Sequence, residues 1–379
     1  MRITAASLGG FRNLQDQSFE FSPRVNLVLG RNGEGKTNLL EALNWFALGR
    51  SHRGSKAEEM VAFDGESLHV SLEVADDRGQ VLHCEFGLDK RGGRRLRLDG
   101  EAVVKRADLV GRLSTVFFNP ESVELVRGGP QARRQFVDQG WSETDPVYLN
   151  NLTHFQRAMK QKTGLLRDLK KGFLDYGAAR EELTAWNREI AGYAAEVCLG
   201  RRQYTELLTP YADTVHRALA NADKRLEFVY QPSLECLKKP AQNTHLADDI
   251  FNEFDYITES EIKRGRPLAG PQLDDCLVRL DGLDLRTFGS QGETRTAAIS
   301  LILARSDVMF ERRQIRPVLF FDDIFSELDG ERTRRLQELA AKLHQVFIAT
   351  ARRDDVAGWH PDGLKAWRVQ GGQFTELED

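Results

Sequence analysis

The pattern of apolar and polar positions along the chain changes near residues 140 and 275. Before the first change, residues 25–29 form a short apolar run that ends at Gly30, which is typical of a buried strand. Residues 68–74 and 81–88 then alternate with a period of two, and Asp99-Gly100 marks a hairpin turn. Residues 1–140 are therefore predicted to contain one buried strand beside a largely antiparallel β lobe.

The middle of the chain has the composition and spacing of helices. Residues 146–175 and 178–219 are rich in Leu, Ala, Glu, Arg and Lys, with few Pro or Gly, which predicts two long helices packed as an antiparallel pair. A further helix is predicted over residues 246–263. We interpret residues 141–275 as a helical arm domain.

Alternating helices and strands return over residues 276–379. Their pattern predicts helices at 294–313 and 330–343, and apolar strands at 317–321 and 345–349. The fold class is thus α/β, with residues 1–140 and 276–379 forming two parts of one domain around the inserted arm.

Composition narrows the class of protein. Of 379 residues, 41% are hydrophobic and 29% charged, which is typical of a soluble protein of two or three domains. No apolar stretch approaches the ~18–20 residues of a membrane span, and the N-terminus lacks a signal-peptide core. The four cysteines lie far apart, which argues against a zinc site or disulfides. We expect a cytoplasmic, nucleoid-associated protein with no membrane partner, whose net charge of −4 restricts DNA contacts to local basic surfaces.

A phosphate-binding loop follows the first apolar run. Gly30-Arg31-Asn32-Gly33-Glu34-Gly35-Lys36-Thr37 fits the pattern G-x-x-x-x-G-K-[ST], and Asn38 continues into a predicted helix. In such a loop the backbone N–H groups face phosphate oxygens, Lys36 reaches the β- and γ-phosphates, and the Thr37 hydroxyl ligates Mg²⁺. The loop therefore predicts that ATP and Mg²⁺ bind here.

The apolar strand near residue 320 ends in two acids, Asp322 and Asp323. Asp322 is predicted to hold the Mg²⁺ shell, as a Walker B aspartate does. Asp323 and Lys36 are the candidate catalytic residues, with Asp323 placed to orient or deprotonate the attacking water. The alternative is an ordinary core strand with a solvated acidic end, which we disfavour because the phosphate loop needs a second carboxylate.

A second candidate phosphate-binding corner is Ser290-Gln291-Gly292-Glu293, at the start of a predicted helix. Free amides at this helix end would bind a γ-phosphate. The same residues also fit a capping box, in which Ser290 and Glu293 satisfy each other's backbone N–H groups. Both interpretations can hold together.

Taken in order, these motifs resemble the ABC-type ATPase heads of the SMC/RecF group. The resemblance rests on the phosphate loop with Asn32 and Asn38, the Ser-Gln-Gly signature, and the Asp-Asp strand end followed by Ser326-Glu327-Leu328-Asp329. It implies an ABC-type P-loop head and an ATP-dependent homodimer. In that dimer Ser290 and Gly292 cap the nucleotide of the other copy, and Asp329 belongs to the D-loop at the interface.

Within this group the chain is similar to the RecF family over most of its length. The matching segments are Phe11-Arg12-Asn13, Ser51-His52-Arg53, Asn119-Pro120-Glu121, Val126-Arg127-Gly128, residues 133–138, Tyr148-Leu149, Lys160-Gln161-Lys162 and residues 270–275. The resemblance implies a recombination mediator in DNA repair, DNA replication and the SOS response. It further implies binding to duplex and gapped DNA, the partners RecR and RecO, and help in loading RecA.

Four positions depart from the family's pattern. Leu273 stands where a basic residue is usual, Glu293 where Gln is usual, and Asp323 where transporter heads have Glu, although Asp there suits RecF. Arg352 lies where many ABC heads place a switch histidine. These departures favour a weak ATPase, in which slow hydrolysis acts as a switch.

Two clusters of basic residues are candidates for contact with DNA phosphates. One lies in the β lobe and includes Arg91, Arg94 and Arg95; the other lies in the arm and includes Lys160, Lys162, Lys170 and Lys171. Basic runs are usually solvated faces, but the family resemblance favours DNA contact with little sequence specificity.

Three other classes of protein fit the sequence less well. An SMC-like structural chromosome ATPase predicts arms of hundreds of residues, whereas the insertion here is far shorter. A transporter subunit predicts a compact helical insertion and normally the switch histidine. A small-molecule P-loop kinase is disfavoured by the Ser290–Gly292 signature and the Asp-Asp strand end.

Overall fold

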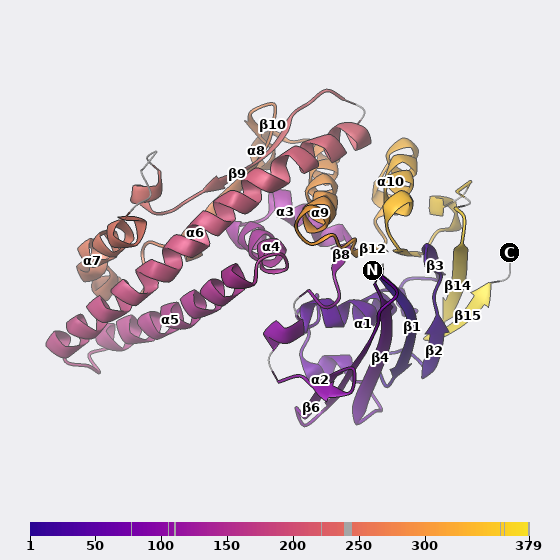
Figure 1. Ribbon diagram of the computed structural model, residues 1–379, viewed down its shortest axis with the longest axis horizontal. Helices are drawn as coiled ribbons and strands as arrows, with labels where there is room; N and C mark the ends of the chain where they lie inside the picture. The colour runs from indigo at the N-terminus through magenta and orange to yellow at the C-terminus, as the bar shows by residue number, and fades with distance from the viewer. Residues whose placement is uncertain are drawn as a thin grey trace. The chain divides into compact units, whose positions relative to one another are not determined.

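The computed structural model describes residues 1–76, 78–104, 106–109, 111–220, 222–238, 245–356, 358–359 and 361–377. The chain forms two compact units (Figure 1). The first contains Met1–Ser122, Thr214–Asp223 and Ala298–Asp379, and the second contains Val123–Asp213 and Lys224–Ala297. In the described residues, no helix combines the length and apolar character needed to cross a membrane.

The bounds of these units differ from the predicted domain boundaries, which followed residues 140 and 275. Helix α4 (Pro130–Ser142) belongs to the second unit with strand β10 (Asp275–Leu280). Arg133 of α4 makes a bidentate ion pair with Asp275 at the start of β10, with Nε–Oδ1 and Nη2–Oδ2 distances of 2.7 and 3.0 Å. This pairing is one contact that joins α4, which precedes the predicted arm, to the arm itself.

The first unit is built on a six-stranded, mostly parallel sheet. Its strand order is β15-β14-β3-β13-β12-β8, and only β15 runs antiparallel to its neighbour. The central strands β3, β12 and β13 are mostly apolar and almost entirely buried, as expected for parallel strands covered on both faces of the sheet. The bounds are β3 (Val25–Leu29), β8 (Thr115–Phe118), β12 (Val318–Asp322), β13 (Val346–Thr350), β14 (Leu364–Gln370) and β15 (Gln373–Leu377).

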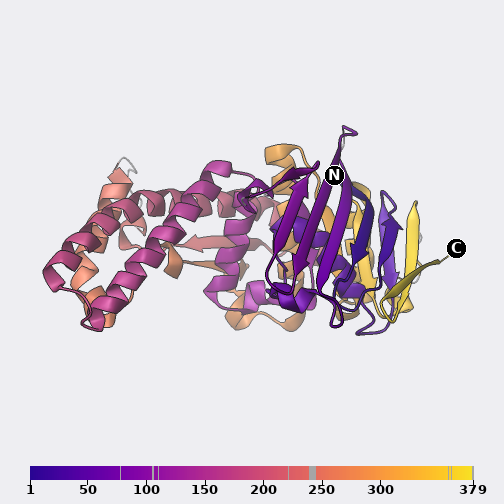
Figure 2. The same ribbon diagram turned by 90° about the horizontal axis from the view of Figure 1, so that it is seen from below.

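The predicted antiparallel lobe is a second sheet in the same unit, seen face-on in Figure 2. Alternate residues of β4, from Leu68 to Val74, point inward, which explains the period of two. Helix α1 (Lys36–Leu48) is buried along most of its length, and its Trp45 stacks on Phe86 of β5 with ring centroids 3.9 Å apart. The strands are β1 (Arg2–Gly9), β2 (Gln17–Glu20), β4 (Ser67–Ala75), β5 (Val81–Asp89), β6 (Arg94–Leu98) and β7 (Glu101–Ala102).

The second unit is mainly helical. Two long helices, α5 (Pro146–Lys170) and α6 (Tyr176–Ala220), run in opposite directions in Figure 1. Tyr148 packs against Gly200 and His154 stacks on Tyr193 at 5.2 Å, so rising residue numbers on α5 meet falling numbers on α6. Helix α5 ends five residues earlier than predicted, at a turn in which Gly172 takes a φ of 73°.

The remaining elements are short or follow the predictions closely. Helix α7 spans Leu246–Arg264 and α10 spans Gly330–Leu343, while α9 (Gln291–Arg313) starts three residues before the predicted position. A three-stranded sheet joins β10 to β9 (Leu226–Gln231) and β11 (Leu283–Asp284). The other helices and turns of 3₁₀ helix are α2 (Ala57–Met60), α3 (Glu124–Arg127), α8 (Leu285–Phe288), η1 (Arg106–Leu109), η2 (Pro120–Val123), η3 (Glu235–Leu237), η5 (Pro271–Leu273), η6 (Phe325–Glu327) and η7 (Arg353–Val356).

A buried ion pair ties α5 to α7. Lys162 Nζ lies 2.7 Å from Glu261 Oε2, and the two side chains are 1% and 0% exposed. Burial lowers the pKa of Lys162, while the Glu261 carboxylate raises it. The prediction that Lys162 contacts DNA is therefore wrong. Its spacing from Met159 and Leu166, which are also buried, places Lys162 on the inward face of the helix.

Glu261→Ala is expected to destabilise the protein by about 3–5 kcal/mol, because it leaves the Lys162 ammonium buried and unpaired. The double change Lys162→Met with Glu261→Gln keeps an acceptor for the Leu268 N–H, which donates to Glu261 Oε1 at 2.9 Å, and should recover most of that loss. Urea unfolding followed by circular dichroism measures both, with the exposed Lys160→Ala as control. Equal losses in the single and double variants would contradict this account.

Candidate nucleotide-binding site

The phosphate loop connects β3 to α1 and depends on two glycines. Gly35 has a φ of 121°, and a Cβ there would lie 2.7 Å from Leu14 Cδ2. A Cβ at Gly30 would lie 2.5 Å from Val369 Cγ1, so this position also excludes a side chain. Helix α1 begins at Lys36 with no side-chain cap, which leaves its first N–H groups available to an anion.

The structure brings the phosphate loop and the end of β12 together. Thr37 Oγ1 donates a hydrogen bond of 2.8 Å to Asp322 Oδ1, although 285 positions separate the two residues. The contact follows from the strand order, since β3 and β12 are parallel and flank β13. The ends of both strands therefore meet at one edge of the sheet.

Lys36 is held against the loop itself. It is 3% exposed, and its Nζ donates to Gly30 O at 3.0 Å and to Asn32 Oδ1 at 3.3 Å. The same Nζ lies 3.7 Å from Asp323 Oδ2. The ammonium thus lies between the loop and the two acids, where a β- or γ-phosphate would meet it.

Asp322 is buried at 5% exposure, and its environment alters its acidity. Burial raises its pKa to about 6; the hydrogen bond from Thr37 opposes this rise, and the charge of Asp323 adds to it. A carboxylate beside a hydroxyl is an all-oxygen donor set that fits Mg²⁺. In the described residues no group of three or more His, Cys, Asp or Glu could hold a metal ion. Mg²⁺ usually keeps several waters and binds through one or two protein oxygens, which the Thr37–Asp322 pair can supply.

Asp323 occupies a strained backbone position. Its φ is 51°, in the left-handed region, and its Oδ1 accepts a hydrogen bond of 3.2 Å from Ala351 N. Ser326 Oγ donates to its carbonyl at 2.9 Å. Such strain persists only where neighbouring groups fix the residue, and here it turns the Asp323 carboxylate toward Lys36.

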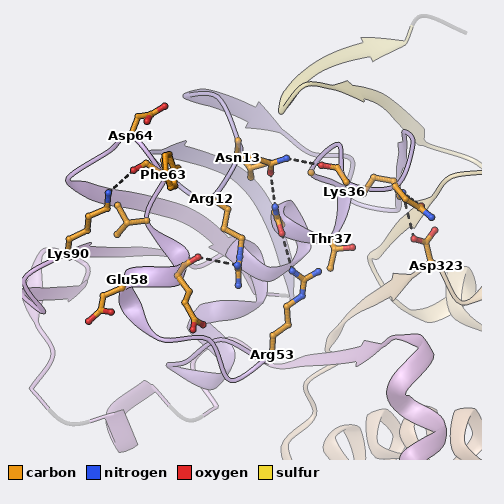
Figure 3. A pocket seen from close by; sticks show the side chains of 18 residues that line it. Arg12, Asn13, Lys36, Thr37, Arg53, Glu58, Phe63, Asp64, Lys90 and Asp323 are labelled. Atoms are coloured by element: carbon orange, nitrogen blue, oxygen red, sulfur yellow. Dashed lines mark hydrogen bonds and ion pairs between the residues drawn. The ribbon is translucent and has the colours of Figure 1, made fainter.

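A pocket of about 950 Å³ opens beside the loop (Figure 3). Lys36, Thr37 and Asp323 lie at one end, and Phe63 and Lys90 lie at the other. Its volume falls within the range of small-molecule sites.

Polar side chains along this pocket hold one another in place. Asn13 Nδ2 donates to Gly33 O at 2.9 Å, and Asn38 Nδ2 donates to Asn13 Oδ1 at 2.7 Å. Arg53 Nη1 in turn donates to Asn38 Oδ1 at 3.2 Å. The chain of bonds links the loop to segments before and after it.

A buried acid organises the arginines of this pocket. Glu41 is fully buried and accepts two hydrogen bonds from Arg12, at 2.7 and 2.9 Å, and one of 2.5 Å from Ser51. Burial alone would raise the pKa of Glu41, but the bonds from Arg12 and Ser51 lower it, so the side chain is a carboxylate. In the sequence analysis, Arg12, Ser51 and Arg53 belong only to triplets that resemble the family, and Glu41 carries no motif. Arg12, Glu41 and Arg53 are thus site candidates that sequence reasoning missed.

The other predicted residues of the loop have different surroundings. Arg31 is exposed. The Glu34 carboxylate accepts a hydrogen bond from Gly371 N, so this side chain is engaged outside the pocket lining. Arg352, considered as a replacement for the switch histidine, has an exposed side chain.

The signature lies in the second unit and the D-loop lies in the first. Ser290 and Gly292 belong to the second unit, where Ser290 and Glu293 form the alternative that the sequence offered, a capping box. Asp329 belongs to the first unit and caps α10, its Oδ1 accepting a hydrogen bond of 2.9 Å from Arg332 N.

The β-lobe cluster of basic residues is divided by the strand that carries it. Arg91 and Arg95 are exposed. Arg94 is exposed as well, but its guanidinium lies over the Trp45 ring, with its Cζ 5.1 Å from the centroid, and it donates to Gly49 O. Neighbouring residues of a strand point to opposite faces, so Arg94 and Arg95 leave β6 on different sides.

The arm cluster gains residues from a second helix. Lys160, Lys170 and Lys171 are exposed, and Lys170 Nζ donates to Arg264 O at 3.1 Å. This contact brings the C-terminal end of α7 beside that of α5. It adds the exposed cations Lys263, Arg264 and Arg266, which the sequence pattern did not single out.

Comparison with known proteins shows the family. The chain matches the RecF/RecN/SMC N terminal domain over residues 2–361. It is 31% identical to the DNA replication and repair protein RecF of Ligilactobacillus salivarius over 99% of this chain and 98% of that protein. It is 32% identical to the RecF of Shouchella clausii over 92% of each chain.

Solved structures of RecF and SMC proteins share the fold of this chain. A structure described as the recombination mediator protein RecF-ATP in the RecFOR pathway superimposes with a TM-score of 0.89 at 28% identity, covering 100% of this chain and 98% of that one. An SmcHead structure shares the fold at a TM-score of 0.59 and 15% identity, covering 100% of this chain and 98% of that one. The predicted fold class, an ABC-type ATPase head with a β lobe and a helical arm, is confirmed. The chain belongs to the RecF family of DNA replication and repair proteins.

Proposed function

We propose that this chain is an ATP-switched recombination mediator that binds ATP with Mg²⁺. The observation that carries the proposal is the hydrogen bond from Thr37 to Asp322, which joins the phosphate loop to a buried carboxylate beside a pocket of suitable size. Lys36 would bind the β- and γ-phosphates, Thr37 and Asp322 would hold Mg²⁺, and Asp323 would orient the attacking water. The bound Mg²⁺ would neutralise charge that develops on the phosphates.

Two copies are proposed to dimerise when ATP binds. Ser290 and Gly292 of one copy would cap the nucleotide held by the other, with Asp329 at the interface. The membership in the RecF family and the likeness to a RecF-ATP structure support this arrangement. Slow hydrolysis would then open the dimer, so the ATPase acts as a switch.

The DNA-binding surface is proposed to lie on the arm. Its exposed cations lie on the C-terminal half of α5 and around the C-terminal ends of α5 and α7, namely Lys160, Lys170, Lys171, Lys263, Arg264 and Arg266. Arg91 and Arg95 of the β lobe are a second candidate surface. We place the action in the cytoplasm on duplex and gapped DNA, with RecR and RecO as partners in loading RecA.

An SMC-like structural role is the weaker alternative. Such a role needs long coiled-coil arms, whereas the longest helix in the described part of the chain is α6, with 45 residues. The likeness to SMC heads concerns the fold, while the relatives that match nearly the whole chain are RecF proteins.

Lys36→Arg is expected to slow single-turnover ATP hydrolysis by about tenfold or more while nucleotide affinity changes far less. The physical reason is shape, because Lys36 Nζ is closely surrounded by loop oxygens that a planar guanidinium cannot reproduce. Binding of a fluorescent ATP analogue and hydrolysis of labelled ATP measure the two effects. Arg31→Lys in the same loop is the control, and an equal loss of binding and hydrolysis would count against the assigned role.

Ser290→Arg should abolish the ATP-dependent dimer while leaving ATP binding by the monomer intact, since a bulky cation would block the interface. Sedimentation of wild type and variant with ATP, with ADP and without nucleotide, each with and without gapped duplex, measures this. Dimers unaffected by the substitution would rule out capping of the partner's nucleotide.

Replacing Lys160, Lys171 and Lys263 by Ala is expected to weaken duplex binding and to flatten its salt dependence. Each lost phosphate contact should reduce the slope of log K against log salt by about 0.9. Fluorescence anisotropy at several salt concentrations measures the slope. An unchanged slope would place the DNA on another surface.

A further inference from the structure

The signature serine already has an anionic partner within its own chain. Ser290 Oγ donates a hydrogen bond of 2.8 Å to Glu293 Oε2, and Ser290 N donates to the same oxygen at 3.0 Å. These two donors, at the start of α9, are the groups expected to receive a γ-phosphate. The Glu293 carboxylate thus occupies them.

A lysine outside the motif fixes this carboxylate. Lys224 Nζ lies 2.7 Å from Glu293 Oε1, the oxygen that does not face Ser290. The Lys224 contact and the two donors of Ser290 lower the pKa of Glu293 to about 2. The side chain is therefore a full anion at any physiological pH, and both of its oxygens are engaged.

The negative charge of Glu293 is not required for its role in the capping box. Glu and Gln serve equally at the third position of a capping box, because either can accept from the backbone N–H of the capping residue. Glu293 is thus an anion at a position where a neutral Gln would complete the same box. The anion opposes a phosphate for two reasons: it fills the donors, and it repels like charge.

We propose that Glu293, fixed by Lys224, is a positioning residue that holds the signature in a self-occupied state and must be displaced from Ser290 before the ATP of another copy can be capped. The inference rests on the proposed ATP-dependent dimer. It adds an electrostatic penalty that must be overcome before the dimer forms. Lys224 and Glu293 both belong to the second unit, so the contact exists within one copy before any partner arrives.

The size of this electrostatic penalty follows from Coulomb repulsion between Glu293 and the γ-phosphate. Two unit charges about 4 Å apart in a water-like medium interact by an amount equivalent to about fivefold in an equilibrium constant. A symmetric dimer contains two such signatures, so the penalty enters twice. Removing the charge should therefore tighten the ATP-bound dimer by about 25-fold at low ionic strength.

Glu293→Gln tests the proposal in the full-length protein. Sedimentation velocity with Mg²⁺ and a slowly hydrolysed ATP analogue should show a dimer dissociation constant about 25-fold lower than that of wild type at low salt. The ratio between the two proteins should fall toward one as ionic strength approaches about 1 M. Monomer affinity for the analogue and thermal stability should match wild type, since the cap remains.

Glu189→Gln on α6 is the matched control, because it removes the same charge from an exposed position of the same unit. It should leave the dimer unchanged. If wild type dimerises with the ATP analogue but Glu293→Gln does so equally or less well, the inference is wrong and the proposed function stands. If neither protein dimerises with the analogue, the proposed dimer itself is wrong.

Discussion

The hydrogen bond between Thr37 and Asp322 depends on the order of strands in one sheet. Because β3, β13 and β12 are parallel neighbours, the loop after the first and the acid at the end of the last face each other across one strand. Everything else at the site is arranged around that pair. Lys36 lies between the loop and the acids, Asp323 is turned toward it by a strained backbone, and α1 points its uncapped start at the same place.

The sequence was most informative where one segment carries both the pattern and the chemistry. The strand at 25–29 and its phosphate loop could be predicted because the apolar run and the glycines are contiguous. The ring of contacts around Glu41 could not, since Arg12 reaches it from a segment before the phosphate loop, and Ser51 and Arg53 from a segment after α1. The bounds of the two units were not predicted either, since they follow from contacts between distant segments, such as that of Arg133 with Asp275.

Charge runs gave the least reliable predictions. Lys162 belongs to a basic run by sequence but lies on the apolar face of its helix, where Glu261 neutralises it. Arg94 and Arg95 are adjacent in sequence, yet the pleat of β6 separates them. Lys263 and Arg264, in contrast, join the arm surface because α7 ends beside α5. A basic surface is a property of neighbouring elements, and residue counts along one segment do not define it.

Burial of Asp322 has a thermodynamic consequence for the whole protein. Its pKa is about 6 in the folded chain against 3.8 for the free side chain, so the folded state holds the proton more tightly than the unfolded one. This group therefore contributes less to stability as pH rises from about 4 to 6, and above pH 6 its ionisation costs the fold about 3 kcal/mol. A cation bound at Asp322 would offset that cost. Metal binding at Asp322 is therefore thermodynamically coupled to the stability of the fold. At mildly acidic pH, metal binding would also release a proton to the buffer.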